Sequence, residues 1–572
     1  MKALQRSRIG QWPVNLAKRP LRAVLFLLIL IFFIMPIARL VYMAFSGESG
    51  LTFIHFKDLL AQPRTWVVLK NTMIVVGGST LIASAIGIML AWLLAYTDLR
   101  GKKLMLFLLY LPLIIPSYIS TLAWTQFLGP DGLFEKMTSW LPFAFGPLNL
   151  YSMTGIVLVM GISHYPLVYL LTVNVFKKIP RDMEQAARCA GASRRKAFVK
   201  VVLPLAFPGI VGGGFLAFLA SLDNFGIPAF LGIPARISVL STYIYEQVIG
   251  FGTSAFSKAA VLSVLLGIIA LAGAGIQWLF LRRARQTETA IIDHEPRYFL
   301  GRMRLSVECL LWLFFAITSI VPLIAMVMTS LLPAYGVAFS WDSLTLKNYA
   351  FILETSPKAK QAMFNSLKLA LVTTGTGVVI GTLFAYLRVR RPNRLLKTAE
   401  GVISLPYALP GTVLALAMIF TWMEPVPGWN PGLYGSILIM FIAYMTRFLI
   451  LQVRGSVTAF MQVDESMEEA ARVSGTNGLA KWRKILVPLI LPGLISGSLL
   501  VFLTALTELT VSSMLWSAKT ETIGVVILNF ENAGSTAYST AFSSLIVGCI
   551  FIGGILMLIL QSLWKRKVAR QA

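Results

Sequence analysis

Long apolar runs separated by short charged segments are the feature that most constrains the fold of this chain. Of its 572 residues, 57% are hydrophobic and only 13% are charged, whereas a soluble domain carries about 25% charged residues. A helix of about 20 apolar residues crosses a bilayer and satisfies its own backbone hydrogen bonds. The sequence therefore predicts an all-α polytopic membrane protein with about 12 transmembrane helices.

The placement of basic residues predicts the orientation of these helices. The predicted spans are 21–45, 68–95, 104–128, 151–175, 205–231, 256–281, 305–331, 366–387, 398–422, 433–453, 489–516 and 541–564. Lys and Arg cluster after alternate spans, which by the positive-inside rule places those segments and both termini in the cytoplasm. This asymmetry accounts for the net charge of +26 without a polyanion partner, and membrane lipid is the expected surrounding. A nucleic-acid partner is not expected.

The chain contains two copies of one unit. Glu184-Gln-Ala-Ala-Arg-Cys-Ala-Gly191 is repeated as Glu468-Glu-Ala-Ala-Arg-Val-Ser-Gly475. Further matches at regular offsets are Asn71 with Asn365, Pro112 with Pro406, Pro116 with Pro410, and Pro204 with Pro488. Because six spans per copy is an even number, the copies have the same orientation, as parallel repeats do in transporters. We expect a first half at 1–281, a cytoplasmic connector at 282–304 and a second half at 305–572.

The inner loops 177–204 and 454–488 are the most informative segments outside the spans. Each predicts a short helix rich in Glu and Ala, a break at Gly191 or Gly475, and a basic amphipathic stretch that ends at a proline. Glycine is the usual residue where a helix ends in the left-handed conformation. A pair of solvated loops is the simpler alternative, but the duplicated pattern favours docking helices for a cytoplasmic partner.

These loops resemble the EAA loop of binding-protein-dependent ABC importer permeases. The second copy fits the motif except at its ending, Leu-Val-Pro488, whereas in the first copy Gln185 stands where the family usually has Glu, with Glu184 beside it. The fusion of two units, and the stretches Leu222–Pro228, Glu508–Val511 and Lys519–Gly524, resemble the ferric-iron importer group. Fused permeases also occur among importers of thiamine and of aminoalkylphosphonates.

The resemblance implies the type I importer permease fold in a bacterial inner membrane. Two copies of a cytoplasmic ATPase would bind the EAA helices, and an external binding protein would deliver the substrate, most simply ferric iron. The sequence has no Gly-x4-Gly-Lys-Ser/Thr loop to bind ATP phosphates. We therefore expect no enzyme activity and no cofactor in this chain, with ATP and Mg on the partner subunits.

The resemblance also assigns residues that would couple transport to the ATPases. They are Glu184, Gln185, Ala186, Ala187, Arg188, Gly191 and Pro204 in the first copy, and Glu468, Glu469, Ala470, Ala471, Arg472, Gly475 and Pro488 in the second. The alanines would pack closely, and the glutamates would offer charged hydrogen-bond acceptors to the partner. For Arg188 and Arg472, a local pair with the glutamate four residues earlier is an equal alternative.

Ionisable residues inside predicted spans are candidates for the substrate pathway, because such residues are costly in lipid. Asp223 and Asn224 align with Thr507 and Glu508 in the outer part of the fifth and eleventh spans. Carboxylates from both halves would suit a hard cation. The alternative is that they cap helices or pair with each other.

His164, Tyr165, Tyr444 and Arg447 occupy the corresponding fourth and tenth spans. A buried His–Tyr hydrogen bond is the commoner explanation for the first two, and Arg447 would instead suit a carboxylate or phosphate on the substrate. No metal site is firmly assigned, because the three cysteines lie far apart. An ion-coupled secondary transporter remains the main rival class, although it would have no use for two EAA-like loops.

Overall fold

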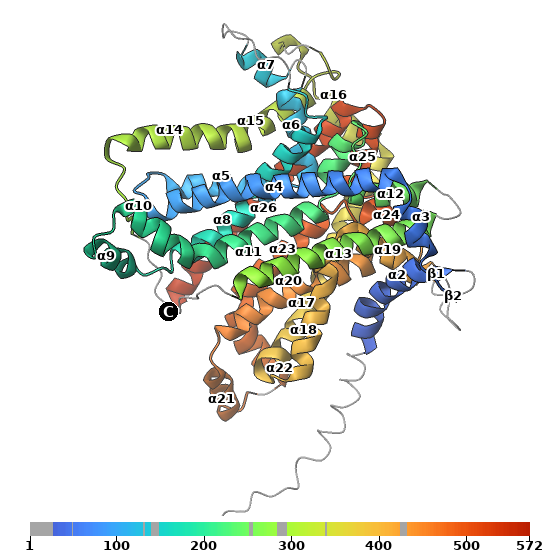
Figure 1. Ribbon diagram of the computed structural model, residues 1–572. Helices are drawn as coiled ribbons and strands as arrows, with labels where there is room; N and C mark the ends of the chain where they lie inside the picture. Colours follow the sequence, from blue (N-terminus) through green and yellow to red (C-terminus); the bar gives the residue numbers. More distant parts are fainter. Residues whose placement is uncertain are drawn as a thin grey trace, which may run out of the picture. The chain divides into compact units, whose positions relative to one another are not determined.

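A computed structural model describes residues 27–47, 50–129, 132–138, 148–250, 255–282, 295–337, 340–423, 432–476 and 478–571. In this part of the chain the protein is helical, with one antiparallel ribbon between β1 (Ser46–Gly47) and β2 (Gly50–Leu51). The predicted all-α membrane fold is confirmed (Figure 1).

The first repeat contains the following elements: η2 (Leu30–Ile34), α2 (Met35–Phe45), α3 (Ile54–Leu60), α4 (Pro63–Tyr96), α5 (Lys102–Ile114), α6 (Ser117–Leu128), α7 (Leu133–Thr138), α8 (Met153–Phe176), α9 (Arg181–Cys189), α10 (Arg194–Ala197), η3 (Phe198–Val202), α11 (Leu203–Asp223), η4 (Pro228–Gly232), α12 (Leu240–Ile249) and α13 (Ala255–Leu281).

The second repeat contains the following elements: η5 (Gly301–Met303), α14 (Arg304–Phe315), η6 (Ala316–Ile320), α15 (Val321–Ser330), η7 (Trp341–Ser343), α16 (Lys347–Ala350), η8 (Phe351–Thr355), α17 (Pro357–Arg390), α18 (Arg394–Ala408), α19 (Gly411–Trp422), α20 (Ile437–Met461), α21 (Glu465–Val473), α22 (Gly478–Lys481), η9 (Trp482–Leu486), α23 (Val487–Leu506), α24 (Ser512–Leu515), α25 (Ile523–Asn532) and α26 (Thr536–Gln571).

Two of the predicted spans are broken helices. Within the described ranges, 10 helices are long and apolar enough to cross a membrane, or up to 12 if each bent pair counts as one span. The spans expected at 104–128 and 398–422 bend by 106° between α5 and α6 and between α18 and α19. Pro116 and Pro410 stand at the breaks with nearly the same backbone angles, φ −54° and −55°. Proline disfavours helical geometry in the residue before it, and Ile115 and Leu409 are both extended.

The fifth and eleventh spans end earlier than predicted. α11 ends at Asp223 and α23 at Leu506, and short segments follow each of them. Residues 223–224 and 507–508 therefore lie at helix C-termini instead of inside the outer part of continuous helices.

A five-residue π turn precedes each of four prolines at equivalent places in the two repeats. η2 precedes Pro36, η3 precedes Pro204, η6 precedes Pro322 and η9 precedes Pro488. Proline lacks an N–H and clashes with the carbonyl four residues earlier, and a π turn gives that carbonyl more room. The helices that begin in the basic stretches therefore continue through Pro204 and Pro488 into α11 and α23.

In space the chain forms two compact units that exchange the first helices of the repeats. One unit comprises residues 1–56, 256–261 and 364–520, and the other comprises 57–255, 262–363 and 521–572. In the first unit α2 packs on α19, and in the second unit α15 packs on α6. Each leading helix thus belongs spatially with the repeat that does not encode it.

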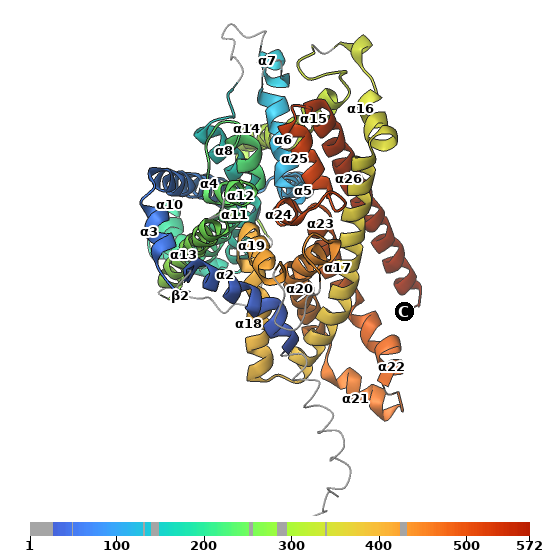
Figure 2. The same cartoon turned by 90° about the vertical axis from the view of Figure 1, so that its right-hand side faces the viewer.

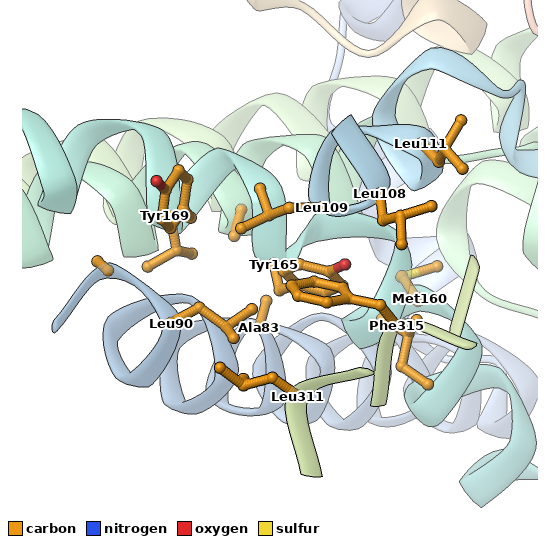
Figure 3. Close-up of a cluster of buried hydrophobic side chains, with 14 of the residues drawn as sticks. Ala83, Leu90, Leu108, Leu109, Leu111, Met160, Tyr165, Tyr169, Leu311 and Phe315 are labelled. Carbon is orange, nitrogen blue, oxygen red and sulfur yellow. The ribbon is translucent and has the colours of Figure 1, made fainter. Parts of the chain in front are cut away.

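The second unit is built on α4, α8 and α11, which lie side by side (Figure 1). Figure 3 shows its buried core, where Leu109 of α5, Tyr165 of α8 and Phe315 of α14 come together with side chains from α4. The first unit has a corresponding pair in α20 and α23, with Phe460 and Ile490 fully buried near their ends. Both EAA-like segments begin where these long helices end.

Candidate functional site

Helices α9 and α21 form the candidate site, and they are equivalent in length and in place within the repeats. Each has nine residues and projects beyond the long helices of its own unit in Figure 1, and Figure 2 shows the same for α21. Gly191 and Gly475 follow them with φ of +87° and +75°, a conformation that favours glycine. The predicted helix and the glycine break in each loop are confirmed.

The exposed faces of the two helices carry matching residues. Gln185, Ala186 and Arg188 are exposed on α9, and Glu469 and Ala470 are exposed on α21. Ala187 is half-buried and Ala471 is buried, while the side chain of Arg472 lies outside the described ones. Sequence reasoning missed Met183 and Met467, which are 44% and 48% exposed at equivalent positions. The occurrence of methionine at the same position in both copies of the motif could have indicated these two residues.

Glu468 does not face the solvent but is buried beneath α21. Its carboxylate accepts hydrogen bonds from Arg390 Nε at 2.6 Å and from Lys481 Nζ at 2.7 Å, and a longer one from the Tyr386 hydroxyl at 3.3 Å. Burial alone would raise the pKa of Glu468, but the bonds from Lys481 and Arg390 outweigh it and hold the pKa below its ordinary value. We call these four residues the second clamp.

Glu184 is buried beneath α9 by a different set of partners. The Tyr298 hydroxyl donates to Glu184 Oε1 at 2.5 Å, and Arg297 Nη1 lies 3.7 Å from Oε2. Burial, followed by the hydrogen bond to Glu184, raises the pKa of the Tyr298 phenol above its ordinary value. We call Glu184, Arg297 and Tyr298 the first clamp. The suggested local pair between Glu184 and Arg188 is not what engages Glu184.

The two buried glutamates change the expected surface of the site. Glu184 and Glu468 were expected to offer acceptors to a partner, but in this structure they fasten each helix to its own unit. The next position is the exposed one, occupied by Gln185 in the first copy and Glu469 in the second. The departure at Gln185 therefore alters the exposed face of α9.

The candidate pathway residues Asn224 and Glu508 lie at equivalent helix ends and act in the same way. Asn224 Oδ1 accepts from the Ile227 N–H at 3.0 Å, and Glu508 Oε1 accepts from the Val511 N–H at 2.7 Å. Glu508 Oε2 also accepts from the Ser512 N–H at 2.9 Å. This is the capping geometry considered as the alternative. Thr507 donates to the Leu503 carbonyl, and Asp223 is half-buried.

His164 belongs to a buried polar chain in the second unit. Its Nδ1 lies 2.9 Å from Ser221 Oγ, which accepts a 3.0 Å hydrogen bond from Ser79 Oγ. This chain joins α8, α11 and α4. The suggested His164–Tyr165 bond is not the one formed, and the Tyr165 ring instead packs against Phe314 at 5.7 Å.

Arg447 and Tyr444 are buried in the first unit, at 6% and 1% exposure. The Arg447 guanidinium lies 5.9 Å from the Phe448 ring, which also packs against Tyr444. A Cβ added at Gly411 would collide with this guanidinium, so glycine at 411 makes room for it. Arg447 therefore occupies the interior of the first unit.

Two repeats of membrane-spanning helices, each exposing one short helix between long spans, are the arrangement of a membrane permease. The chain belongs to the family described as binding-protein-dependent transport system inner membrane component, which matches residues 83–286 and 377–570. Membership implies a substrate-binding protein and an ATPase partner.

Among curated relatives, a ferric transport system permease protein FbpB of Actinobacillus pleuropneumoniae is 24% identical over 92% of this chain and 76% of its own length. The molybdenum transport system permease protein ModB of Escherichia coli is 30% identical over 37% of this chain and 93% of its own. A solved bacterial alginate ABC transporter chain, 22% identical, covers 48% of this chain and 97% of its own, with a TM-score of 0.40.

Proposed function

We propose that this protein is the fused permease of an ATP-driven importer for ferric iron. The observation that carries the substrate assignment is the similarity to a ferric permease, which extends over 92% of this chain and thus over both repeats. An external binding protein would deliver the iron, and two copies of a cytoplasmic ATPase would supply the energy by hydrolysing ATP. Both termini, the connector, α9 and α21 would face the cytoplasm, following the positive-inside rule.

Energy from ATP would enter through α9 and α21. Their exposed methionines and alanines form small apolar faces that suit a groove on the ATPase, since flexible methionine adapts to a partner surface. After the turn at Gly191, α10, η3 and α11 run on as one helix from Arg194 to Asp223, and after the break at Gly475, α22, η9 and α23 do the same from Gly478 to Leu506. A displacement of either docking helix would reach a whole span as a rigid-body movement, which is one of the established forms of a transport switch.

An oxyanion importer is the second candidate, and Arg447 is the observation in its favour. A buried guanidinium suits molybdate, sulfate or phosphate better than a cation, because it binds such anions through paired hydrogen bonds. The similarity to the molybdenum permease is higher in identity but covers only 37% of this chain. The experiment described below also tests thiamine and aminoalkylphosphonates as substrates.

The experiment is reconstitution of the permease with its ATPase and binding protein in proteoliposomes. ATP hydrolysis is measured with binding protein loaded with ferric iron, molybdate, thiamine or an aminoalkylphosphonate. We expect stimulation by the ferric form alone. Stimulation by an anion alone would reject iron and make Arg447 the first residue to replace, while no stimulation by any form would reject a coupled importer.

A further inference from the structure

The two clamps hold equivalent glutamates, yet they draw on different parts of the sequence. α4 and α17 both have 34 residues and correspond from end to end. The last residue of α17 is Arg390 of the second clamp, whereas the last residue of α4 is Tyr96. In the same alignment Trp92 replaces Tyr386, and Ala197 at the end of α10 replaces Lys481 at the end of α22. The first repeat therefore lacks all three partners that bind Glu468.

The connector supplies the missing groups to Glu184. Arg297 provides the guanidinium, and it lies 4.4 Å from the centre of the Tyr96 ring, the residue that replaces Arg390. Tyr298 provides the phenol, and its ring lies 5.9 Å from Trp92, the residue that replaces Tyr386. The side chains of Arg297 and Glu184 are 3% and 7% exposed, so this pair is as thoroughly buried as its counterpart.

The described part of the connector, from residue 295 onward, is fastened within the second unit. The N–H groups of Arg297 and Tyr298 both donate to the Tyr96 carbonyl, at 2.7 and 2.9 Å. The Arg297 guanidinium also donates to the Ile179 carbonyl, just before α9. This segment thereby joins the end of α4 to the start of α9.

A second set of contacts continues into α14. The Leu300 N–H donates to Asp98 Oδ1 at 2.9 Å, and Arg304 pairs with both Asp98 and Glu308. Glu308 in turn accepts from the Arg100 N–H at 2.8 Å. The turn between α4 and α5, the connector and the first helix of the second repeat therefore form one continuous polar network.

We propose that Arg297 and Tyr298 are positioning residues for α9, so that the connector is a working part of the coupling apparatus and not a passive link between repeats. This inference rests on the proposed role of α9 as a docking helix. The connector segment 295–300 fixes α9 through Glu184 and carries its displacement to α4, α5 and α14. The second repeat performs the same task with Arg390, Tyr386 and Lys481 from its own helices.

The test compares matched variants of the two clamps in the full-length reconstituted transporter. Tyr298→Phe and Arg297→Gln weaken the first clamp, and Tyr386→Phe and Arg390→Gln weaken the second. The readouts are uptake of radioactive ferric iron per ATP hydrolysed, the amount of permease in the membrane and its thermal midpoint. Since a hydrogen bond to a charged group shifts an equilibrium by roughly tenfold or more, we expect uptake per ATP to fall several-fold in Tyr298→Phe and further in Arg297→Gln. Arg297→Lys should restore part of it.

The outcomes separate this inference from the proposed function. Loss of coupling in both sets supports both. Loss only in the second-clamp variants rejects a role for the connector and leaves the docking helices in place. Normal coupling in every variant rejects α9 and α21 as coupling elements. A drop in membrane level or thermal midpoint with uptake per ATP unchanged would make Arg297 and Tyr298 merely structural and would also overturn the inference. If the reconstitution experiment rejects ferric iron, the same variants are tested for uptake of the substrate whose loaded binding protein stimulates ATP hydrolysis.

Discussion

The Tyr298 hydroxyl donates a 2.5 Å hydrogen bond to Glu184, so the connector between the repeats contacts the helix that the sequence marks as the docking element. The equivalent glutamate, Glu468, is bound by Arg390 and Lys481 from its own repeat. Duplicated chains need not keep the same partners for the same residue. Here the equivalent carboxylates of Glu184 and Glu468 bind different sets of partners. Each set fixes a short helix that projects from its unit.

Glu468→Gln should destabilise the permease. Removing the negative charge leaves Arg390 and Lys481 close together and nearly buried, and breaking a buried ion pair costs about 3–5 kcal/mol. The thermal midpoint in detergent measures this effect. The double variant Glu468→Gln with Lys481→Met should recover part of the loss, because it removes the stranded ammonium. An unchanged midpoint in the single variant would show that the clamp contributes nothing to stability.

The second clamp should also give a defined pH dependence. The pKa of Glu468 is held below its ordinary value of 4.5, so the folded state favours the ionised form. Its contribution to stability is then fully present above pH 4.5 and is lost as pH falls through the lowered pKa. Proteolysis of the α21 loop should be constant from about pH 5 to 8 and rise only in more acid solution. Glu468→Gln should lack this rise.

Replacement of either helix-terminal glycine should disturb its docking helix. Gly191 and Gly475 have φ near +80° and open space around them, so Gly191→Ala and Gly475→Ala cost about 1–2 kcal/mol through backbone strain alone. Gly401→Ala is the matched control, because Gly401 also has open space but lies inside α18 without a positive φ. Uptake per ATP should fall in the first two variants and not in the control. The same uptake per ATP in all three variants would show that the left-handed backbone conformation of Gly191 and Gly475 does not matter for coupling.

Charge reversal on the exposed face of α21 should weaken binding of the ATPase. Glu469 is exposed, so Glu469→Lys should leave folding intact and reduce binding of the ATPase, most strongly at low salt. Gln185→Lys on α9 should have a smaller effect, because no negative charge is lost there. Co-purification of the ATPase with each variant measures this. Full ATPase retention by Glu469→Lys would reject the assigned docking surface.

Asp223 and Glu508 should respond differently to neutralisation. Both oxygens of Glu508 accept backbone N–H groups, so Glu508→Gln should lower stability by about 1 kcal/mol through loss of one acceptor. Asp223→Asn should instead lower ferric uptake by more than any change in the thermal midpoint explains, because it removes a carboxylate from the proposed pathway. Uptake and melting curves on both variants decide the matter. Normal uptake in Asp223→Asn would remove it from the pathway.

The sequence alone was sufficient for the elements that depend on local chemistry. Apolar length predicts the spans, glycine predicts the breaks at 191 and 475, and the duplicated motif predicts two docking helices, because these features depend on neighbouring residues. It also repeats Pro116 and Pro410 at matched positions, but it does not predict the breaks of 106° there. The helix ends at Asp223 and Leu506 escaped prediction, since an apolar run continues past both of them.

Only the tertiary structure decided which polar groups meet. Nothing in the spacing of residues 184, 297 and 298 relates the connector to α9, because a side chain can pair with any segment that the fold brings within about 3–4 Å. The burial of Glu184 and Glu468, the capping by Glu508 and the exchange of α2 and α15 between units have the same origin. Local sequence determines what each segment can form, and long-range packing determines what it contacts.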